Sequence, residues 1–378
     1  NKAVFEDVGQ WKRPYYYPKN KENMHDAVKR ECLAVRESLG ILDASTLGKI
    51  DLQGPDTVKF LNMIYTNAWS QLDIGSCRYG IMCNEHGMIF DDGVTTRIGE
   101  HRYHMTTTTG GAAKVMSWLE EFLQTEWLDM KVFCTSVTEQ WSVLSISGPN
   151  SRAFLQDLTD INLSKESFPF MKFREGQVCG IKARVFRISF TGELSYEVNV
   201  PARYGKFVWE QFIEHGKKYN ITPYGTETMH VLRAEKGFII VGQDTDGSAT
   251  PIDMNMDWIV SKKKEDFLGK RSFTRPDTIR PDRKKFVGLL VNDKKTVLPE
   301  GSHIVEKALK QPPMKMLGHV TSSYYSPTLG HPIALAMLQD GLNRMGEQVL
   351  IPLMSGKVVE ATVSDTIFYD KEGMRNNE

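Results

Sequence analysis

The stretches LQGPDTVKFLNMI (Leu52–Ile64) and ISGPNSRAFLQDL (Ile146–Leu158) resemble each other. Each reads as the end of a strand, a Gly-Pro pair, an Asp or Asn able to cap a helix, and an amphipathic helix with Phe-Leu at matched positions. Proline close to the first helical turn, with Asp or Asn beside it, is typical of a helix start. The repetition predicts two related α+β units, although two independent helix starts would give the same pattern.

The segments around this repeat predict a mixed fold. The length of the chain, 378 residues, suggests two or three domains. Apolar residues at helical spacing predict helices at Asn23–Leu39, Ala113–Gln124, Tyr204–Tyr219 and His230–Phe238, the last ending at Gly237. Gly80–Arg97 reads as a hairpin turning at NEHG, and the opening FEDVGQWKRPYYYP (Phe5–Pro18) is expected to be irregular because prolines interrupt it.

The C-terminal quarter has a different pattern. The basic, polar segment Ser261–Phe286 reads as a connector. After it come only short apolar runs separated by turn residues, among them VGLLV, PIALAML and VEATVSDTIFY. Short strands at regular spacing predict a small β-barrel or sandwich at this end of the chain.

Composition argues against several classes of protein, although a local basic groove remains an alternative. Lys plus Arg and Asp plus Glu are both 47, so the basic excess of a nucleic-acid-binding chain is missing. Five scattered cysteines without a C-x-x-C pair argue against a disulfide framework and favour a reducing compartment, so a cytoplasmic location is expected. The chain contains no apolar run of membrane-spanning length, no H-E-x-x-H and no G-x-G-x-x-G. We expect neither a signal peptide nor a metal site. The first residue is Asn, so either a start has been trimmed or the chain is a piece of a longer polypeptide.

The strand within NEHGMIFDDGVTTRI (Asn84–Ile98) carries two adjacent carboxylates, although strands usually avoid aspartate. Side chains alternate along a strand, so Asp92 shares a face with apolar Phe90, Val94 and Ile98, while Asp91 has polar neighbours. Burial would raise the pKa of Asp92 into the range that suits proton transfer near neutral pH. The alternative is a core aspartate paired with Arg78 or another arginine.

Two further candidates carry charge. In SFTGELSYEV (Ser189–Val198), Glu193 and Glu197 fall on one face of a strand, which would also suit a solvated sheet surface. In the helix HVLRAEKGF (His230–Phe238), Arg233 offers a planar set of donors suited to a carboxylate ligand. Surface pairing with Glu235 or Glu227 is the alternative for Arg233.

Taken together, these stretches resemble the aminomethyltransferase (glycine cleavage T-protein) family. Within it the chain is most similar to the C-terminal, folate-binding half of the α subunit of heterotetrameric sarcosine oxidase. The motifs run in family order from Val4 to about Met337: FEDVGQWKRPYYYP, GMIFDDG, SISGPNSR, FTGELSYEV, VLRAEKGFIIVGQDTDGSATP, DFLGKRSF and SPTLGHPIALAML.

The resemblance implies an α+β fold, a three-domain cloverleaf of the T-protein type with a C-terminal β-barrel. We expect a first α+β, folate-binding domain at 1–50 plus 140–245 and a second α+β domain at 51–139. A connector at 246–285 and the barrel at 286–378 complete this division.

The resemblance also implies the site residues. Asp92 would be catalytic, next to N5 and N10 of tetrahydrofolate, with Asp91 beside it. Glu197 matches the glutamate that holds the pteridine ring, and Glu193 would be its companion. Arg233 matches an arginine that meets the glutamyl tail or nearby folate groups. The expected pocket also has two aromatic lining residues, Tyr79 and Trp258.

The implied activity is tetrahydrofolate-dependent transfer of an aminomethyl or methylene unit, giving 5,10-methylenetetrahydrofolate from a small-molecule amine such as a sarcosine-derived iminium or glycine. A flavoprotein or a lipoyl protein would be the partner, with neither nucleic acid nor membrane involved. The alternative is the folate-binding part of a flavin-dependent sarcosine oxidase or dehydrogenase complex. A non-catalytic folate-binding protein is a third reading.

Overall fold

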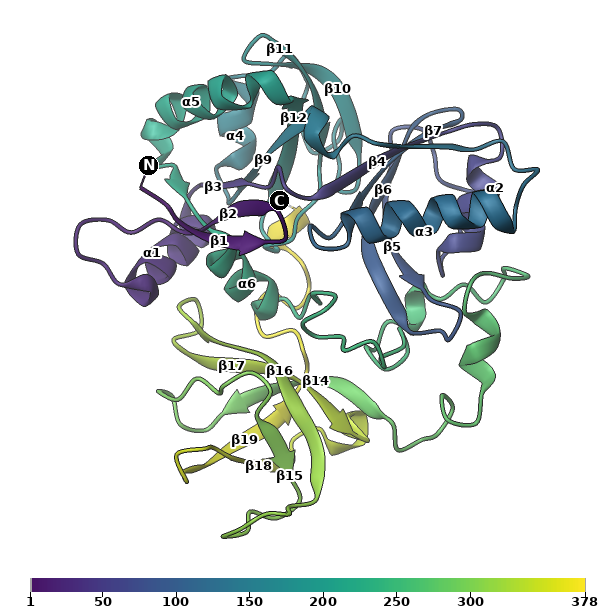
Figure 1. The fold of residues 1–378 in the computed structure, drawn as a ribbon. Coiled ribbons are helices and arrows are strands. Elements are labelled where there is room, and N and C mark those ends of the chain that lie inside the picture. Colours follow the sequence, from purple (N-terminus) through teal and green to yellow (C-terminus); the bar gives the residue numbers. More distant parts are fainter. Residues whose placement is uncertain (1, 378) are drawn as a thin grey trace. The chain divides into compact units, whose positions relative to one another are not determined.

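A computed structural model describes residues 2–377 (Figure 1). Contacts divide it into two compact units. The first comprises the chain up to Ile81, Asp91–Met229 and the segment from Gly373; the second comprises Met82–Phe90 and His230–Glu372. The helices are α1 (Met24–Glu37), α2 (Thr57–Ile64), α3 (Ala112–Thr125), α4 (Ser151–Gln156), α5 (Gly205–His215) and α6 (Thr226–Glu235). The four predicted helices outside the repeat are therefore confirmed, with boundaries shifted by a few residues.

A six-stranded sheet in the first unit has the order β10-β11-β12-β9-β3-β13. Its strands are β3 (Gly40–Asp43), β9 (Trp141–Ser147), β10 (Phe173–Val178), β11 (Ile181–Phe186), β12 (Ser195–Pro201) and β13 (Thr222–Pro223). Neighbours are antiparallel except β3 and β13. Phe154 of α4 and Phe212 of α5 pack with Ile146 and Tyr196 of the sheet in one buried cluster, so these helices cover one face.

A five-stranded sheet has the order β5-β6-β7-β4-β8. Its strands are β4 (Gly48–Gln53), β5 (Cys77–Cys83), β6 (Ile89–Gly99), β7 (Arg102–Thr107) and β8 (Phe133–Ser136). The predicted hairpin is confirmed, since β5 and β6 flank a turn in which the Asn84 amide donates to the carbonyl of Met88 at 2.9 Å. Gly87 has a φ of 78° there, a conformation that glycine adopts at little cost.

The two Gly-Pro repeats adopt the same local geometry. Gly54 and Gly148 have φ of 139° and 128°, and each precedes a short helix, α2 or α4. A Cβ at Gly54 would lie 2.0 Å from the carbonyl oxygen of Lys131, and one at Gly148 would lie 2.5 Å from that of Ser38. Each glycine is therefore required by close contact with a passing backbone.

The predicted caps of these two helices were wrong in mechanism. Asp56 and Asn150 occupy the N-cap positions, but neither side chain bonds its own helix. Asp56 instead accepts a hydrogen bond from the Lys131 amide at 2.8 Å, and Asn150 donates to the Ser38 hydroxyl at 3.1 Å. In each repeat the side chain therefore binds the same residue that the glycine approaches: Lys131 in the first repeat and Ser38 in the second.

The opening of the chain is a hairpin, so the prediction of an irregular segment was wrong. β1 (Val4–Val8) pairs with β2 (Trp11–Tyr16) in a two-stranded antiparallel sheet. The two-residue connection begins at Gly9, whose φ is 59°. Pro14 is tolerated because a strand with only one neighbour has an edge that needs no donor.

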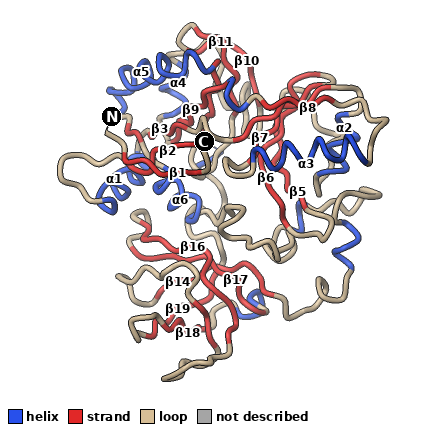
Figure 2. The backbone as a smooth tube through the Cα atoms, viewed as in Figure 1, coloured by secondary structure: helices blue, strands red, loops and turns tan. Residues whose placement is uncertain are grey.

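The second unit ends in a closed barrel with the order β14-β17-β16-β15-β18-β19, which confirms the predicted C-terminal barrel. The strands are β14 (Lys284–Val291), β15 (His303–Val305), β16 (Met316–Ser326), β17 (His331–Gln339), β18 (Gln348–Pro352) and β19 (Val358–Ser364). Loops and short 3-10 turns connect α6 to β14 (Figure 2). No helix within residues 2–377 is both long and apolar enough to cross a bilayer.

Candidate functional site

Asp92 and Tyr79 form a pair on the neighbouring strands β6 and β5. The Tyr79 hydroxyl donates to Oδ2 of Asp92 at 2.6 Å. The Arg78 guanidinium instead donates to the carbonyl of Ala68 and lies over the Trp69 ring. Within residues 2–377 no arginine pairs with Asp92, so the alternative of an ordinary core ion pair is wrong.

The adjacent aspartate, Asp91, accepts hydrogen bonds from within the fold, and its role toward folate remains a prediction. Asp91 is only 2% exposed and accepts hydrogen bonds from the Asp92 amide, the Thr108 amide and the Thr108 hydroxyl, at 2.7, 3.2 and 2.9 Å. Both faces of β6 are covered, so side-chain alternation alone does not tell the two aspartates apart. Asp91 ties β6 to the turn before α3, whereas Asp92 keeps part of its surface accessible.

Burial changes the acidity of Asp92. It raises the pKa of the carboxyl from the ordinary 3.8 to about 7, and the charge of Asp91 adds to this rise. The hydrogen bond from Tyr79 acts in the opposite direction because it stabilises the ionised form. A carboxyl with such a pKa can both hold and release a proton near neutral pH.

Glu197 is the second carboxylate with a raised pKa. It lies on β12, opposite Ser145 of β9 and Phe186 of β11. Burial raises its pKa from 4.5 to about 7, and the charge of Lys49 opposes the rise. The side chain is partly accessible, and within the described part of the chain no hydrogen bond engages its carboxylate. Its two oxygens are thus available to accept donors from a ligand.

Glu193 is held by two arginines, and its role toward folate remains a prediction. It is 1% exposed and accepts from Nη1 of Arg36 at 2.9 Å and from Nε of Arg375 at 3.1 Å. Burial raises its pKa, and the two arginines oppose that rise. The solvated-surface alternative is therefore wrong for Glu193, and its partners differ from the open environment of Glu197.

The two sheets of the first unit meet through faces that carry both polar and apolar side chains. Arg184 of β11 lies 3.5 Å from Asp51 of β4, and the ring of Phe186 stacks on His104 of β7 at 5.6 Å. His104 in turn contacts Asp51 through Nδ1 at 2.6 Å. Strand register places Thr96 of β6 beside His104, on the same face as Asp92. Asp92 and Glu197 therefore belong to the two surfaces that pack together here.

Lys49 is a charged residue of this region that the sequence analysis missed. Its side chain is fully buried, and Nζ donates to the carbonyls of Ser45 and Leu47 at 2.8 and 2.7 Å. Burial lowers its pKa to about 8, while the charges of Glu197 and Asp43 act against that change. The alternation of Lys49 and Asp51 with apolar residues in GKIDLQ is the signal that could have identified it.

Arg233 and Trp258 belong to the second unit. Arg233 is fully buried and donates to Oδ2 of Asp244 at 2.5 Å and to Ser322 at 2.7 Å. Surface pairing with Glu235 or Glu227 is therefore wrong, because the guanidinium fastens the segment after α6 to β16. Trp258 lies in a short 3-10 turn and is 69% exposed. The roles of both residues toward folate remain predictions.

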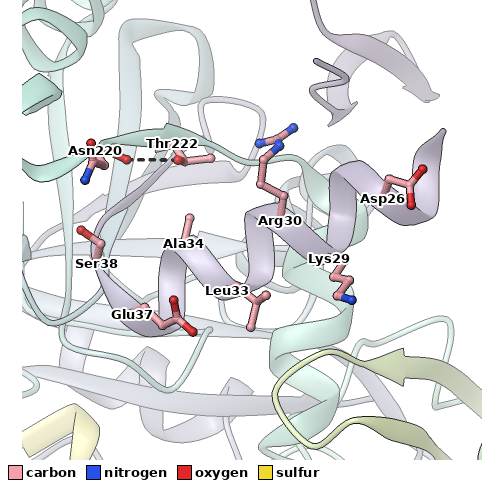
Figure 3. Close-up of a pocket in the computed structure, with 9 residues that line it drawn as sticks. All are labelled: Asp26, Lys29, Arg30, Leu33, Ala34, Glu37, Ser38, Asn220 and Thr222. Atoms are coloured by element: carbon pink, nitrogen blue, oxygen red, sulfur yellow. Dashed lines mark hydrogen bonds between the residues drawn. The ribbon is translucent and has the colours of Figure 1, made fainter. Parts of the chain in front are cut away.

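A surface groove of about 500 Å³ runs along α1 (Figure 3). It contains none of the predicted site residues, and its charged side chains are of both signs. The lining residues are Asp26, Lys29, Arg30, Leu33, Ala34, Glu37, Ser38, Asn220 and Thr222. No cluster of three metal-binding side chains occurs among the described residues.

Comparison with known proteins identifies two matching family models. The model of the GCVT N-terminal domain matches residues 1–264, and that of the glycine cleavage T-protein C-terminal barrel domain matches residues 284–370. The solved structure of glycine cleavage system aminomethyltransferase T from Bartonella henselae superposes with a TM-score of 0.84 and 25% identity, over 98% of this chain and 95% of that one. This likeness agrees with the predicted T-protein-type fold.

Curated relatives carry two kinds of name. Sarcosine oxidase subunit alpha of Corynebacterium sp. (strain U-96) is 53% identical over 99% of this chain, and its counterpart in Rhizobium meliloti is 41% identical. The chain spans only 39% and 38% of the length of these two relatives. Aminomethyltransferase of Thermotoga petrophila is 29% identical over 97% of this chain and 94% of its own length.

Proposed function

Because the chain belongs to the glycine cleavage T-protein family, we propose that it binds tetrahydrofolate and transfers a one-carbon unit to it from an amine, yielding 5,10-methylenetetrahydrofolate. The comparisons support a folate-dependent transferase of the aminomethyltransferase type. The observation that carries the proposal is the unengaged Glu197 carboxylate on a sheet that packs against the sheet of Asp92.

The residues present fit a reduced pterin. A pterin ring presents neighbouring N–H groups, and a carboxylate can accept two of them side by side. Glu197 offers such a carboxylate, because no hydrogen bond within the described chain occupies it. Lys49 contributes a buried positive charge that favours the ionised form of Glu197, which accepts hydrogen bonds best.

Asp92 would carry the proton chemistry. Bound tetrahydrofolate supplies two nucleophilic nitrogens, N5 and N10, that accept the one-carbon unit. A partly buried anion at Asp92 stabilises positive charge that develops on the reacting groups. With a pKa of about 7, the Asp92 carboxyl can also take up a proton and return it. Tyr79 holds Oδ2 in place during both tasks.

The amine donor follows from the relatives. The 53% identity to a subunit named for sarcosine oxidase favours an N-methyl amino acid such as sarcosine as the source of the iminium, in preference to glycine. A second candidate function is the folate-binding part of a flavin-dependent sarcosine oxidase, since the chain spans 39% of that relative. Flavin would then reside on another polypeptide segment. Co-purification of a yellow partner from the source organism would favour this second function.

Transfer assays test the proposal. The protein would be given tetrahydrofolate and a formaldehyde-level donor, and formation of methylenetetrahydrofolate would be followed by its reduction in a coupled dehydrogenase assay. Asp92→Asn should lower the rate by about 10²–10⁴-fold, the scale of acid–base groups. Asp129→Asn, at an exposed position after α3, should leave it unchanged. A parent rate in the Asp92→Asn protein would refute the assignment.

A further inference from the structure

The segment that begins at Gly373 returns to the first unit and contacts it closely. Nε of Arg375 donates to Oε2 of Glu193 at 3.1 Å, and its Nη2 donates to the carbonyl of Arg36 at 2.5 Å. The carbonyl of Asn376 accepts from Nη2 of Arg187 at 2.7 Å. Glu193, Arg36 and Arg187 are each no more than 4% exposed, so these contacts lie in the interior of the first unit.

These contacts converge on the loop before β12. Nη1 of Arg36 donates to Oε1 of Glu193 at 2.9 Å and to the carbonyl of Thr191 at 2.8 Å. Within the loop, the Glu193 amide donates to the Thr191 hydroxyl at 3.3 Å. The loop is thus fixed by two arginines, one from α1 and one from the C-terminal segment.

The loop leads directly into the strand that carries Glu197. β12 begins at Ser195, whose hydroxyl donates to the Ser147 hydroxyl of β9 at 2.8 Å, and whose carbonyl accepts from Arg187 at 3.5 Å. Only Tyr196 separates Ser195 from Glu197. The β9 and β11 ladders hold the backbone of Glu197, and the loop fixes the end of β12 that lies two residues before it. Binding groups keep a productive geometry only when the residues around them are held in place.

We propose that Arg375 is a positioning residue: by holding Glu193, the C-terminal segment fixes the Thr191–Ser195 loop and thereby sets the Glu197 carboxylate for the pterin. This inference rests on the proposed function, because Glu197 is taken to meet folate. It does not require Arg375 to contact folate.

The charges in the clamp, the ion-pair cluster of Arg36, Glu193 and Arg375, explain why an arginine is needed at position 375. A buried carboxylate is costly unless cations compensate it, and Glu193 has two. Without Arg375, only one of these two cations, Arg36, would still pair with Glu193. Oε2 of Glu193 would lose the hydrogen bond that Arg375 donates to it. The loop would then lose its link to the C-terminal segment while the β12 ladder stays paired with β9.

Two readouts test the inference in the whole chain. In the ligand-free protein, Arg375→Ala should accelerate amide hydrogen exchange at residues 191–197. Tetrahydrofolate should bind to the variant about tenfold more weakly, a loss of about 1.4 kcal/mol. Arg375→Lys, which keeps the charge, should recover part of both effects. Arg344→Ala, which removes a surface pairing with Glu347, is the matched control and should change neither.

The outcomes separate the two proposals. Unchanged exchange and unchanged affinity in Arg375→Ala would overturn the positioning role while leaving the proposed function intact. If Arg375→Ala does not fold, Arg375→Lys gives the same comparison with a smaller expected change. Absence of tetrahydrofolate binding by the parent protein would refute the proposed function and with it this role, whatever the exchange data show for the loop.

Discussion

The raised pKa of Asp92 makes a direct prediction about stability. The pKa of this carboxyl is about 7 in the folded chain, against 3.8 for an ordinary aspartate. A group whose folded pKa lies above its unfolded value stabilises the fold fully below the unfolded pKa, and this stability is lost as the pH rises through the folded pKa. The parent free energy of unfolding should therefore fall between about pH 4 and about pH 7 on account of Asp92.

The magnitude follows from the size of the shift. Each pKa unit corresponds to about 1.4 kcal/mol, so two pH units, from about pH 5 to about pH 7, lower the contribution of Asp92 by at most about 2.7 kcal/mol. Asp92→Asn removes this titration but keeps a side chain of the same shape. The variant should therefore gain stability relative to the parent by up to that amount across this range, while losing transfer activity, a trade-off common at functional sites.

Urea unfolding of parent and variant across this pH range measures the effect. Glu197 titrates over the same range in both proteins, so its contribution largely cancels in the difference between them. Asp129→Asn, at the exposed position after α3, serves as the control and should track the parent. A difference between Asp92→Asn and parent that stays constant with pH would show that Asp92 is not held with a raised pKa, and the proton-transfer role would fail.

Three further variants probe neighbouring groups. Tyr79→Phe removes a hydrogen bond to the ionised Asp92 that is worth about 1.5–3 kcal/mol. The acidic limb of the pH–rate profile should therefore move to higher pH by about one unit or more. An acidic limb at the parent position would contradict the pairing of Tyr79 with Asp92. Lys49→Met removes the charge that favours ionised Glu197, so the pH dependence of tetrahydrofolate affinity should shift to higher pH, and an unshifted titration would count against Lys49. Glu193→Gln breaks the buried ion pairs with Arg36 and Arg375 and should lower the free energy of unfolding by about 3–5 kcal/mol in urea titrations. A urea midpoint equal to that of the parent would show that these ion pairs do not hold the loop.

The local features of the fold could be predicted because they depend on short-range patterns. The Gly-Pro repeats, the hairpin at Asn84–Met88 and the C-terminal barrel strands follow from turn residues and alternation. The opening hairpin was missed because Pro14 argued against a strand, and only the structure shows that β2 has a free edge there. Asp56 and Asn150 were misread as caps because their true partners, Lys131 and Ser38, are distant in sequence.

The roles of the site residues were harder to predict, because they depend on partners that are distant in sequence. Side-chain alternation favoured Asp92 over Asp91 as the site residue. Asp91 is bound instead by Thr108, which directly follows β7 and is distant from Asp91 in sequence. Glu193 and Glu197 look equivalent in sequence, and they are distinguished by Arg36 and Arg375, which both pair with Glu193 from distant parts of the chain. Lys49 was overlooked because a lysine in a strand is normally solvated, and its burial depends on how two sheets pack.

Anaerobic calorimetric titration with tetrahydrofolate tests the central claim, that the Glu197 carboxylate binds a reduced pterin. The parent protein should give a saturable one-site isotherm, and Glu197→Gln should weaken affinity by about 30-fold or more, since hydrogen bonds to charged groups contribute about 1.5–3 kcal/mol each. Glu210→Gln, at an exposed position on α5, should match the parent. Absence of binding heat with the parent, or equal affinities for parent and Glu197→Gln, would contradict the account.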